Sequence, residues 1–158
     1  MASTIFIIMI CYEELSTVLT DSGISPGVIR IFDEDFVLPT PHWIMNDLGA
    51  SMGKFLFDTG IKFEYNQYEC NKFAKTATTI ADWSWAKTTT REVALAFGMF
   101  GYLESGGHMI NIAVHRDDTS KLYLAFYEPQ PTPPNFVCLT KKTLSKEDIQ
   151  SCIICLFL

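Results

Sequence analysis

Two alternating segments separated by a turn constrain the fold more than any other feature of this sequence. Residues 108–114 (HMINIAV) and 122–128 (LYLAFYE) alternate between the two faces of a strand, and residues 116–120 (RDDTS) between them favour a turn. The pattern predicts an antiparallel hairpin. If the loop covers 117–119, His108 lies directly opposite Glu128, with Cβ atoms roughly 5 Å apart.

The same register makes one face of the hairpin apolar except for the His108–Glu128 pair at its end. An ionisable pair at the edge of a core is costly unless its members satisfy each other. A carboxylate in this position can also fix a histidine tautomer and stabilise the imidazolium. A purely structural hydrogen bond is the alternative. His42 and His115 show no such partner, and we expect both at the surface.

Cys70 is the thiol that could use this pair. Small and apolar residues recur at three- and four-residue steps after it, which predicts a helix beginning near Asn71. A helix N-terminus and a nearby imidazole both stabilise a thiolate. The sequence therefore indicates a nucleophile, base and orienting group in Cys70, His108 and Glu128. Side-chain donors to an oxyanion are expected from Asn66 and Gln67, and less strongly from Asn111.

The other cysteines fit a reactive role less well. Their total of five is odd, and no signal segment is evident, so we expect reduced thiols in a chain of cytoplasmic type or one associated with a virion. Cys11 lies in an apolar run and Cys138 in an expected strand. The pair Cys152 and Cys155 stands inside CIICLFL without a second ligand pair, which favours buried packing over a redox or zinc site.

The layout of the whole chain predicts one α+β domain over residues 1–158. Helices are expected in the first half, including one from Thr40 to near Gly53, and an antiparallel sheet in the second half, with a last buried strand at 152–158. On the helix after Cys70, we expect Trp85 in the core and Trp83 partly exposed.

Composition excludes some classes of function. The 158 residues carry a net charge of −6 with scattered basic residues, which argues against nucleic-acid binding. The apolar run at 5–11 is too short to span a membrane. A core is readily built, because 48% of the residues are hydrophobic.

Three short motifs together resemble a known family. They are YECNKFA at 68–74, GHMIN at 107–111 and YEPQ at 127–130. In this order and spacing they resemble the C-terminal cysteine protease domain of the Marasmius oreades agglutinin and its lectin-free relatives, some of them encoded by phages. The resemblance covers roughly residues 37–158.

The resemblance implies a papain-like fold, with the cysteine at a helix start packed on an antiparallel sheet. It implies a triad of Cys70, His108 and Glu128, with Gln130 in support, that hydrolyses peptide or amide bonds. Calcium or manganese is a possible cofactor by the same resemblance, with Glu69 as one ligand. The carbohydrate-binding half of the agglutinin has no counterpart in this sequence.

The function that these residues predict is a thiol hydrolase, either a cysteine peptidase or an amidase. The alternative is a non-catalytic structural or binding module on the same scaffold, which could form homo-oligomers or join a larger, phage-type assembly. The apolar segments 5–11 and 152–158 motivate that alternative, because any part left exposed would form an interface. An acyl transferase would use the same residues.

Overall fold

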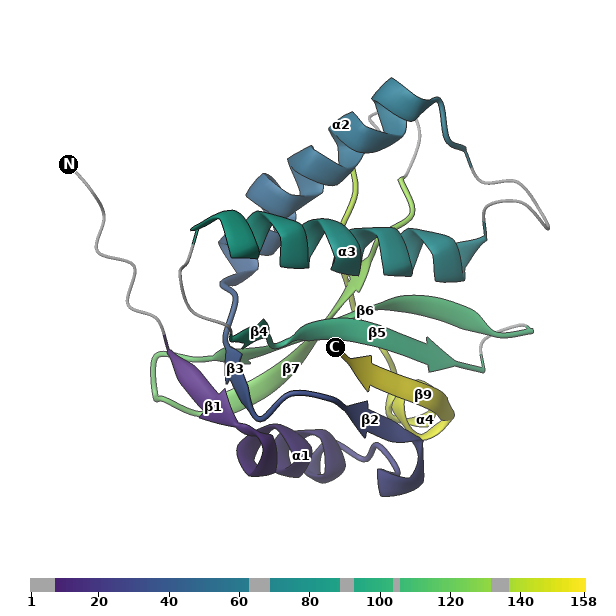
Figure 1. The fold of residues 1–158 in the computed structure, drawn as a ribbon. Coiled ribbons are helices and arrows are strands. Elements are labelled where there is room, and N and C mark those ends of the chain that lie inside the picture. The colour runs from purple at the N-terminus through teal and green to yellow at the C-terminus, as the bar shows by residue number, and fades with distance from the viewer. Residues whose placement is uncertain (1–7, 63–68, 89–92, 104–105, 132–136) are drawn as a thin grey trace.

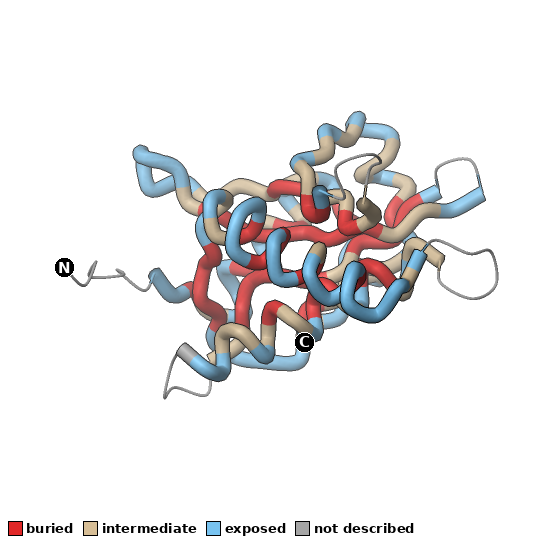
Figure 2. The backbone as a smooth tube through the Cα atoms, turned by 90° about the horizontal axis from the view of Figure 1, so that it is seen from above, coloured by how far each residue is buried: buried red, intermediate tan, exposed pale blue. Residues whose placement is uncertain are grey.

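The computed structural model describes residues 8–62, 69–88, 93–103, 106–131 and 137–158. Its centre is a six-stranded sheet with helices on both faces (Figure 1). A smaller three-stranded sheet stands beside it. Buried residues concentrate along the central strands (Figure 2), and a hydrophobic cluster packs on each face of the large sheet.

The six-stranded sheet has the order β2-β9-β5-β6-β7-β8. Its strands are β2 (Ile29–Ile31), β5 (Phe97–Tyr102), β6 (His108–Arg116), β7 (Leu122–Glu128), β8 (Thr140–Lys142) and β9 (Cys152–Phe157). The pairs along β9-β5-β6-β7-β8 are antiparallel, whereas β2 pairs in parallel with β9. The first half of the chain therefore supplies an edge of this sheet.

The three-stranded sheet has the order β1-β3-β4 and joins distant parts of the sequence. Strand β1 (Met9–Cys11) runs antiparallel to β3 (Asp35–Val37), which runs parallel to β4 (Ala94–Leu95). These strands have two or three residues each. Such short strands carry almost no periodicity, and they are held by their non-local partners.

Helices cover the two faces of the large sheet separately. On one face lie α2 (Gly49–Thr59), which continues the π-helical segment η2 (Trp43–Leu48), and α3 (Cys70–Thr88) (Figure 1). On the other face lie α1 (Tyr12–Asp21), the short 3-10 turn η1 (Pro26–Val28) and α4 (Lys146–Gln150). None of these helices, within the described part of the chain, is long and apolar enough to cross a membrane.

Each face of the sheet has its own hydrophobic cluster, and strand alternation assigns residues between them. On β6, Ile110, Ile112 and Val114 belong to the cluster under α1. Ala113, between them, belongs to the cluster under α2 and α3. This two-sided burial explains why β6 reads as nearly continuous apolar sequence.

The predicted helical first half with a purely antiparallel second half is wrong. Strands β1, β2 and β3 lie in the first half, and the large sheet is mixed because of the parallel β2–β9 pair. The physical reason is the length of these strands. The three residues of β3, held by remote partners, leave no local signal, whereas the alternation of residues 28–32 predicts β2 and the long strands β6 and β7 are predicted as well.

Candidate functional site

His108 and Glu128 form a close pair at the end of the β6–β7 hairpin. The Nε2 atom of His108 lies 2.7 Å from Oε2 of Glu128, and about a fifth of each side chain is exposed (21% and 20%). The imidazole also packs in a T-shaped arrangement with the buried ring of Tyr102, with 5.9 Å between the ring centroids. Tyr102 thus supports the pair on its buried side, and the other side of the pair is open to solvent.

Two further groups surround the Glu128 carboxylate. The backbone N–H of Gln130 donates to Oε1 at 3.2 Å, and Nζ of Lys142 lies 3.7 Å from Oε2. The same ammonium lies 5.7 Å from the centroid of the Tyr102 ring. The Glu128 carboxylate thus lies between an imidazole and an ammonium. Together they offer a negatively charged acceptor and a positively charged donor in one polar cluster. We call His108, Glu128 and Lys142 the polar cluster.

The register that builds this pair differs from the predicted one by two residues. Arg116 pairs with Leu122, and Asn111 pairs with Tyr127. The turn takes five residues because Oδ1 of Asp117 accepts the N–H groups of Thr119 and Lys121. A shift of two residues keeps every side chain on its predicted face. His108 therefore reaches Glu128 diagonally across the strands instead of standing directly opposite.

Cys70 is the first residue of α3 and is half-buried. In Figure 1, α3 begins at the end of the molecule at which β5 ends and β6 begins, so Cys70 and His108 share that end. However, His108 pairs with Tyr102 on the α1 face of the sheet, whereas α3 covers the other face. Among the described residues, no hydrogen bond joins the Cys70 thiol to the His108 ring.

Asn111 anchors α3 to the sheet. It is fully buried, and its Nδ2 atom lies 3.0 Å from the carbonyl oxygen of Ala74, 3.2 Å from the Thr78 hydroxyl and 3.0 Å from the carbonyl oxygen of Gly98. Its own Oδ1 has no partner in the described part of the chain. The expected oxyanion support from Asn111 stays a prediction, while these bonds give the residue an anchoring role.

Of the remaining predicted site residues, the structure describes some and not others. Asn66 and Gln67 lie outside the described residues. The carbonyl of Glu69 accepts the N–H groups of Lys72 and Phe73, so this residue begins the first turn of α3. No group of three or more His, Cys, Asp or Glu side chains suited to a metal ion occurs within the described residues. Calcium or manganese binding stays an expectation from the sequence.

A buried histidine site was missed. His115, predicted at the surface, is only 1% exposed; its Nδ1 lies 2.7 Å from the Pro39 carbonyl oxygen and its Nε2 lies 2.8 Å from the Tyr127 hydroxyl. Burial lowers the pKa of His115 to about 4, so the ring is neutral at pH 7. It donates from Nδ1 to Pro39 and accepts the Tyr127 proton at Nε2. Its position on the same hairpin face as Asn111 and Tyr127 was the available signal. His42 is exposed, as predicted.

Comparison with solved structures shows that this architecture is shared with about half of two longer chains. One solved structure is described as a "PSL1a-E64 complex" (TM-score 0.66, 17% identity, 92% of this chain and 50% of that one). Another is Polyporus squamosus lectin bound to a sialylated human-type influenza-binding epitope (TM-score 0.57, 16% identity, 88% of this chain and 47% of that one). This chain therefore spans about half the length of these structures. Neither a protein-family model nor a curated protein matches the sequence.

These comparisons correct the expected family. The assignment to a papain-like cysteine protease domain of the agglutinin type, and with it the terms hydrolase and thiol protease, is wrong, because the similar solved structures are those of a lectin. The motifs that carried the assignment are short, and one of their residues, Asn111, has a structural task in this fold. Motifs of a few residues can recur for packing reasons alone.

Proposed function

We propose that residues 1–158 act as a binding module whose ligand contacts the polar cluster of His108, Glu128 and Lys142. The observation that carries the proposal is the self-contained His108–Glu128 pair at 2.7 Å, which is partly exposed and has no bond to the Cys70 thiol in the described structure. Such a pair is already satisfied without a nucleophile. It still offers charged donors and acceptors at the surface.

The proposed ligand is a glycan with a carboxylate. One support is the similar structure of Polyporus squamosus lectin, which is bound to a sialylated epitope. Another is the chemistry of the cluster, since Glu128 can accept bonds from sugar hydroxyls and Lys142 can pair with a carboxylate. The buried ring of Tyr102 contacts His108 and lies near the Lys142 ammonium, which supports these two members of the cluster on their buried side.

Isothermal titration with the trisaccharide Neu5Acα2-6Galβ1-4GlcNAc tests this function. We expect binding by the natural chain and a loss of about tenfold or more in Glu128→Gln and in Lys142→Ala. The asialo disaccharide should bind less tightly than the trisaccharide, and Lys142→Ala should remove most of that difference. A matched control is Lys121→Ala, an exposed lysine at the opposite end of β7. Equal affinity in all three variants would contradict the proposed site.

A second candidate function rests on Cys70 itself. Its place at the start of the 19-residue helix α3 favours a thiolate, and one similar structure is a complex with E64. In this candidate Cys70 is a nucleophile served by His108 and Glu128 after a rearrangement at the shared end of the molecule. The thiolate would open the epoxide of E64, forming a C–S bond and breaking a C–O bond, while the imidazolium protonates the released alkoxide.

Mass spectrometry separates the two candidates. For the binding module, incubation with E64 near neutral pH leaves Cys70 unmodified or labels it no faster in the natural chain than in His108→Ala. A single adduct on Cys70 that forms rapidly and is lost in His108→Ala would favour the nucleophile. Cys138, which is 1% exposed, serves as the internal reference thiol.

A further inference from the structure

A second surface feature lies away from the polar cluster, between α2 and α3. An open groove of about 430 Å³ runs there, floored by Ile80 and flanked by Phe55 and Trp83. Trp83 is 65% exposed and Phe55 is 39% exposed. Lys72, Lys75, Thr76 and Thr79 complete its lining. A large exposed indole in a groove is the kind of anchor on which protein partners concentrate their binding energy.

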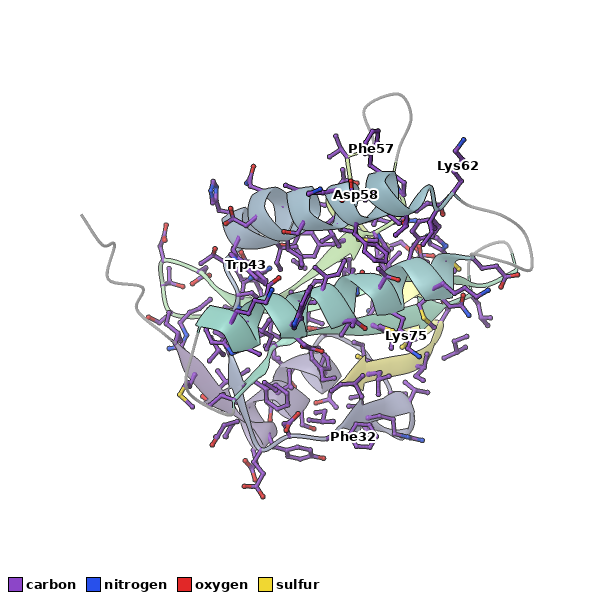
Figure 3. All side chains as sticks on the ribbon, turned by 45° about the horizontal axis from the view of Figure 1, so that its top comes forward. Phe32, Trp43, Phe57, Asp58, Lys62 and Lys75 are labelled. Atoms are coloured by element: carbon purple, nitrogen blue, oxygen red, sulfur yellow. The ribbon has the colours of Figure 1, made fainter. Side chains whose placement is uncertain are left out.

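The charge around this groove is opposite to that of the whole chain. The chain carries a net charge of −6, yet Lys72 and Lys75 line the groove and Lys87 lies beside it, with its Nζ atom 3.7 Å from the centroid of the Trp83 ring. Figure 3 shows Lys75 extending outward from α3. Along α3, Asp82 is the only acidic residue, against these three lysines. The groove is thus apolar with a basic rim.

We propose that this groove docks an acidic amphipathic helix of a partner protein. Apolar side chains of the helix would rest on Trp83, Phe55 and Ile80, as a helix does in the groove between two others. Glutamate and aspartate side chains along the flanks of the docked helix would pair with Lys72 and Lys75. The basic rim on an acidic chain would also speed the approach of an acidic partner.

The chemistry of the lining favours a protein helix over a glycan at this groove. A sugar needs several convergent hydrogen-bond partners, whereas the neutral polar groups of the lining are the hydroxyls of Thr76 and Thr79. The Thr79 hydroxyl already donates to the backbone carbonyl of Lys75 at 3.0 Å. The aromatic and aliphatic surface that remains suits Leu or Phe side chains, and the lysines suit carboxylates.

Fluorescence anisotropy with a labelled acidic amphipathic peptide of roughly 15–20 residues tests the proposal. We expect binding at low ionic strength that weakens as salt rises from about 50 to about 500 mM. Trp83→Ala and the double variant Lys72→Glu/Lys75→Glu should each weaken binding about tenfold or more. The double variant should in turn bind a peptide in which Lys replaces Glu, which the natural chain does not.

Phe57→Ala provides the matched control, because Phe57 is an aromatic of α2 that is 84% exposed and outside this groove. It should leave peptide affinity unchanged, and circular dichroism should show every variant folded. Unchanged binding in Trp83→Ala, or failure of the charge-swapped peptide to bind the double variant, would overturn the proposal. So would competition at this groove by a sialylated trisaccharide in place of the peptide.

Discussion

The Nε2 atom of His108 and the Oε2 atom of Glu128 lie 2.7 Å apart although the two residues are not directly opposite in the hairpin. Continuing the observed register sets Ile110 opposite Glu128. The imidazole of His108 must therefore extend along β6 toward the position of Ile110 to meet the carboxylate. The Tyr102 ring, roughly perpendicular to the imidazole, supports it in that position. Lys142 approaches the same carboxylate from β8, the neighbouring strand on the other side.

Replacing the Glu128 carboxylate should lower the stability of the fold as well as the affinity for ligand. Glu128→Gln keeps the shape of the side chain but removes the charge that faces both His108 and Lys142. We expect the free energy of unfolding to fall by about 1–3 kcal/mol, because the hydrogen bonds involved are charge-assisted and partly exposed. Urea unfolding followed by circular dichroism measures this change. An unfolding energy equal to that of the natural chain would mean that the pair is not formed in solution.

His115 should make stability depend on acidic pH. Burial lowers the pKa of His115 to about 4 from an ordinary value of 6.5, so the unfolded chain binds a proton more readily than the folded one between these values. Its stabilising effect is complete above pH 6.5 and decreases as pH falls toward 4, by about 3 kcal/mol in total. Urea unfolding at pH 7 and pH 5 should differ, and His115→Phe should reduce the difference. An equal pH slope in both proteins would contradict this assignment.

Asn111 should be required for the seating of α3 on the sheet. Asn111→Leu removes a donor from the buried carbonyl oxygens of Ala74 and Gly98. We expect a loss of about 1–3 kcal/mol in the free energy of unfolding, since buried hydrogen bonds between the sheet and α3 are lost, although the Thr78 hydroxyl still donates to the Ala74 carbonyl at 3.0 Å. Hydrogen exchange should show α3 opening more readily than β7. A uniform increase in exchange over the chain would argue against a local anchor.

Close packing of β5 against β9 predicts an intolerant glycine. A Cβ atom at Gly98 would stand 2.2 Å from the carbonyl oxygen of Leu156, so Gly98→Ala must move one backbone away from the other. We expect a loss of about 3 kcal/mol or more. Gly27→Ala is the control, because its Cβ would meet only Ser25 Oγ at 3.8 Å. Thermal unfolding of the two variants should therefore give clearly different midpoints.

The five cysteines should differ in reactivity according to burial. Burial raises the pKa of the Cys138 and Cys152 thiols to about 11, and raises that of Cys155 well above its ordinary value. Cys11 and Cys70 are only half-buried. Iodoacetamide near pH 7, with peptide mapping, should label Cys11 and Cys70 first. Earlier labelling of Cys155 would mean that β9 is not seated as described.

Strand alternation predicted the hairpin well because β6 and β7 are long and each face has a consistent character. The strand and turn positions were confirmed, and so were the faces of His108 and Glu128. The predicted register was wrong by two residues, because the number of residues held by an aspartate side chain in a turn depends on hydrogen bonds that the sequence does not fix.

Helices were predicted in type better than in extent. The helix expected to end near Gly53 continues to Thr59, where Gly60 adopts φ +67 as a left-handed cap. A glycine inside a helix can be required by close packing, as at Gly49 against the Cys138 carbonyl. From the sequence alone such a glycine looks like the end of the helix. Trp83 is exposed as predicted, whereas Trp85 is half-buried and donates from its indole to the Val93 carbonyl at 3.0 Å.

The surface prediction for His115 gave the adjacent turn more weight than the hairpin face that His115 shares with Asn111 and Tyr127. An adjacent turn suggested the surface, but the residue is covered from outside the hairpin by the segment that contains Pro39. The short strand β3 was missed because both of its partners are remote in sequence. The alternation of residues 28–32 and 93–103 predicted β2 and β4, and residues 5–11, which contain β1, left strand and helix undecided. Contacts between distant segments decide these features.

Magnetic resonance of the three histidine rings gives the most direct test of the central claim, that the polar cluster is a ligand-binding site. Titrating ¹⁵N-histidine-labelled protein with Neu5Acα2-6Galβ1-4GlcNAc should move the ring resonances of His108 in a saturable way. Those of the exposed His42 and the buried His115 should stay in place. Unmoved His108 resonances at saturating trisaccharide, or equal shifts of all three rings, would contradict the account.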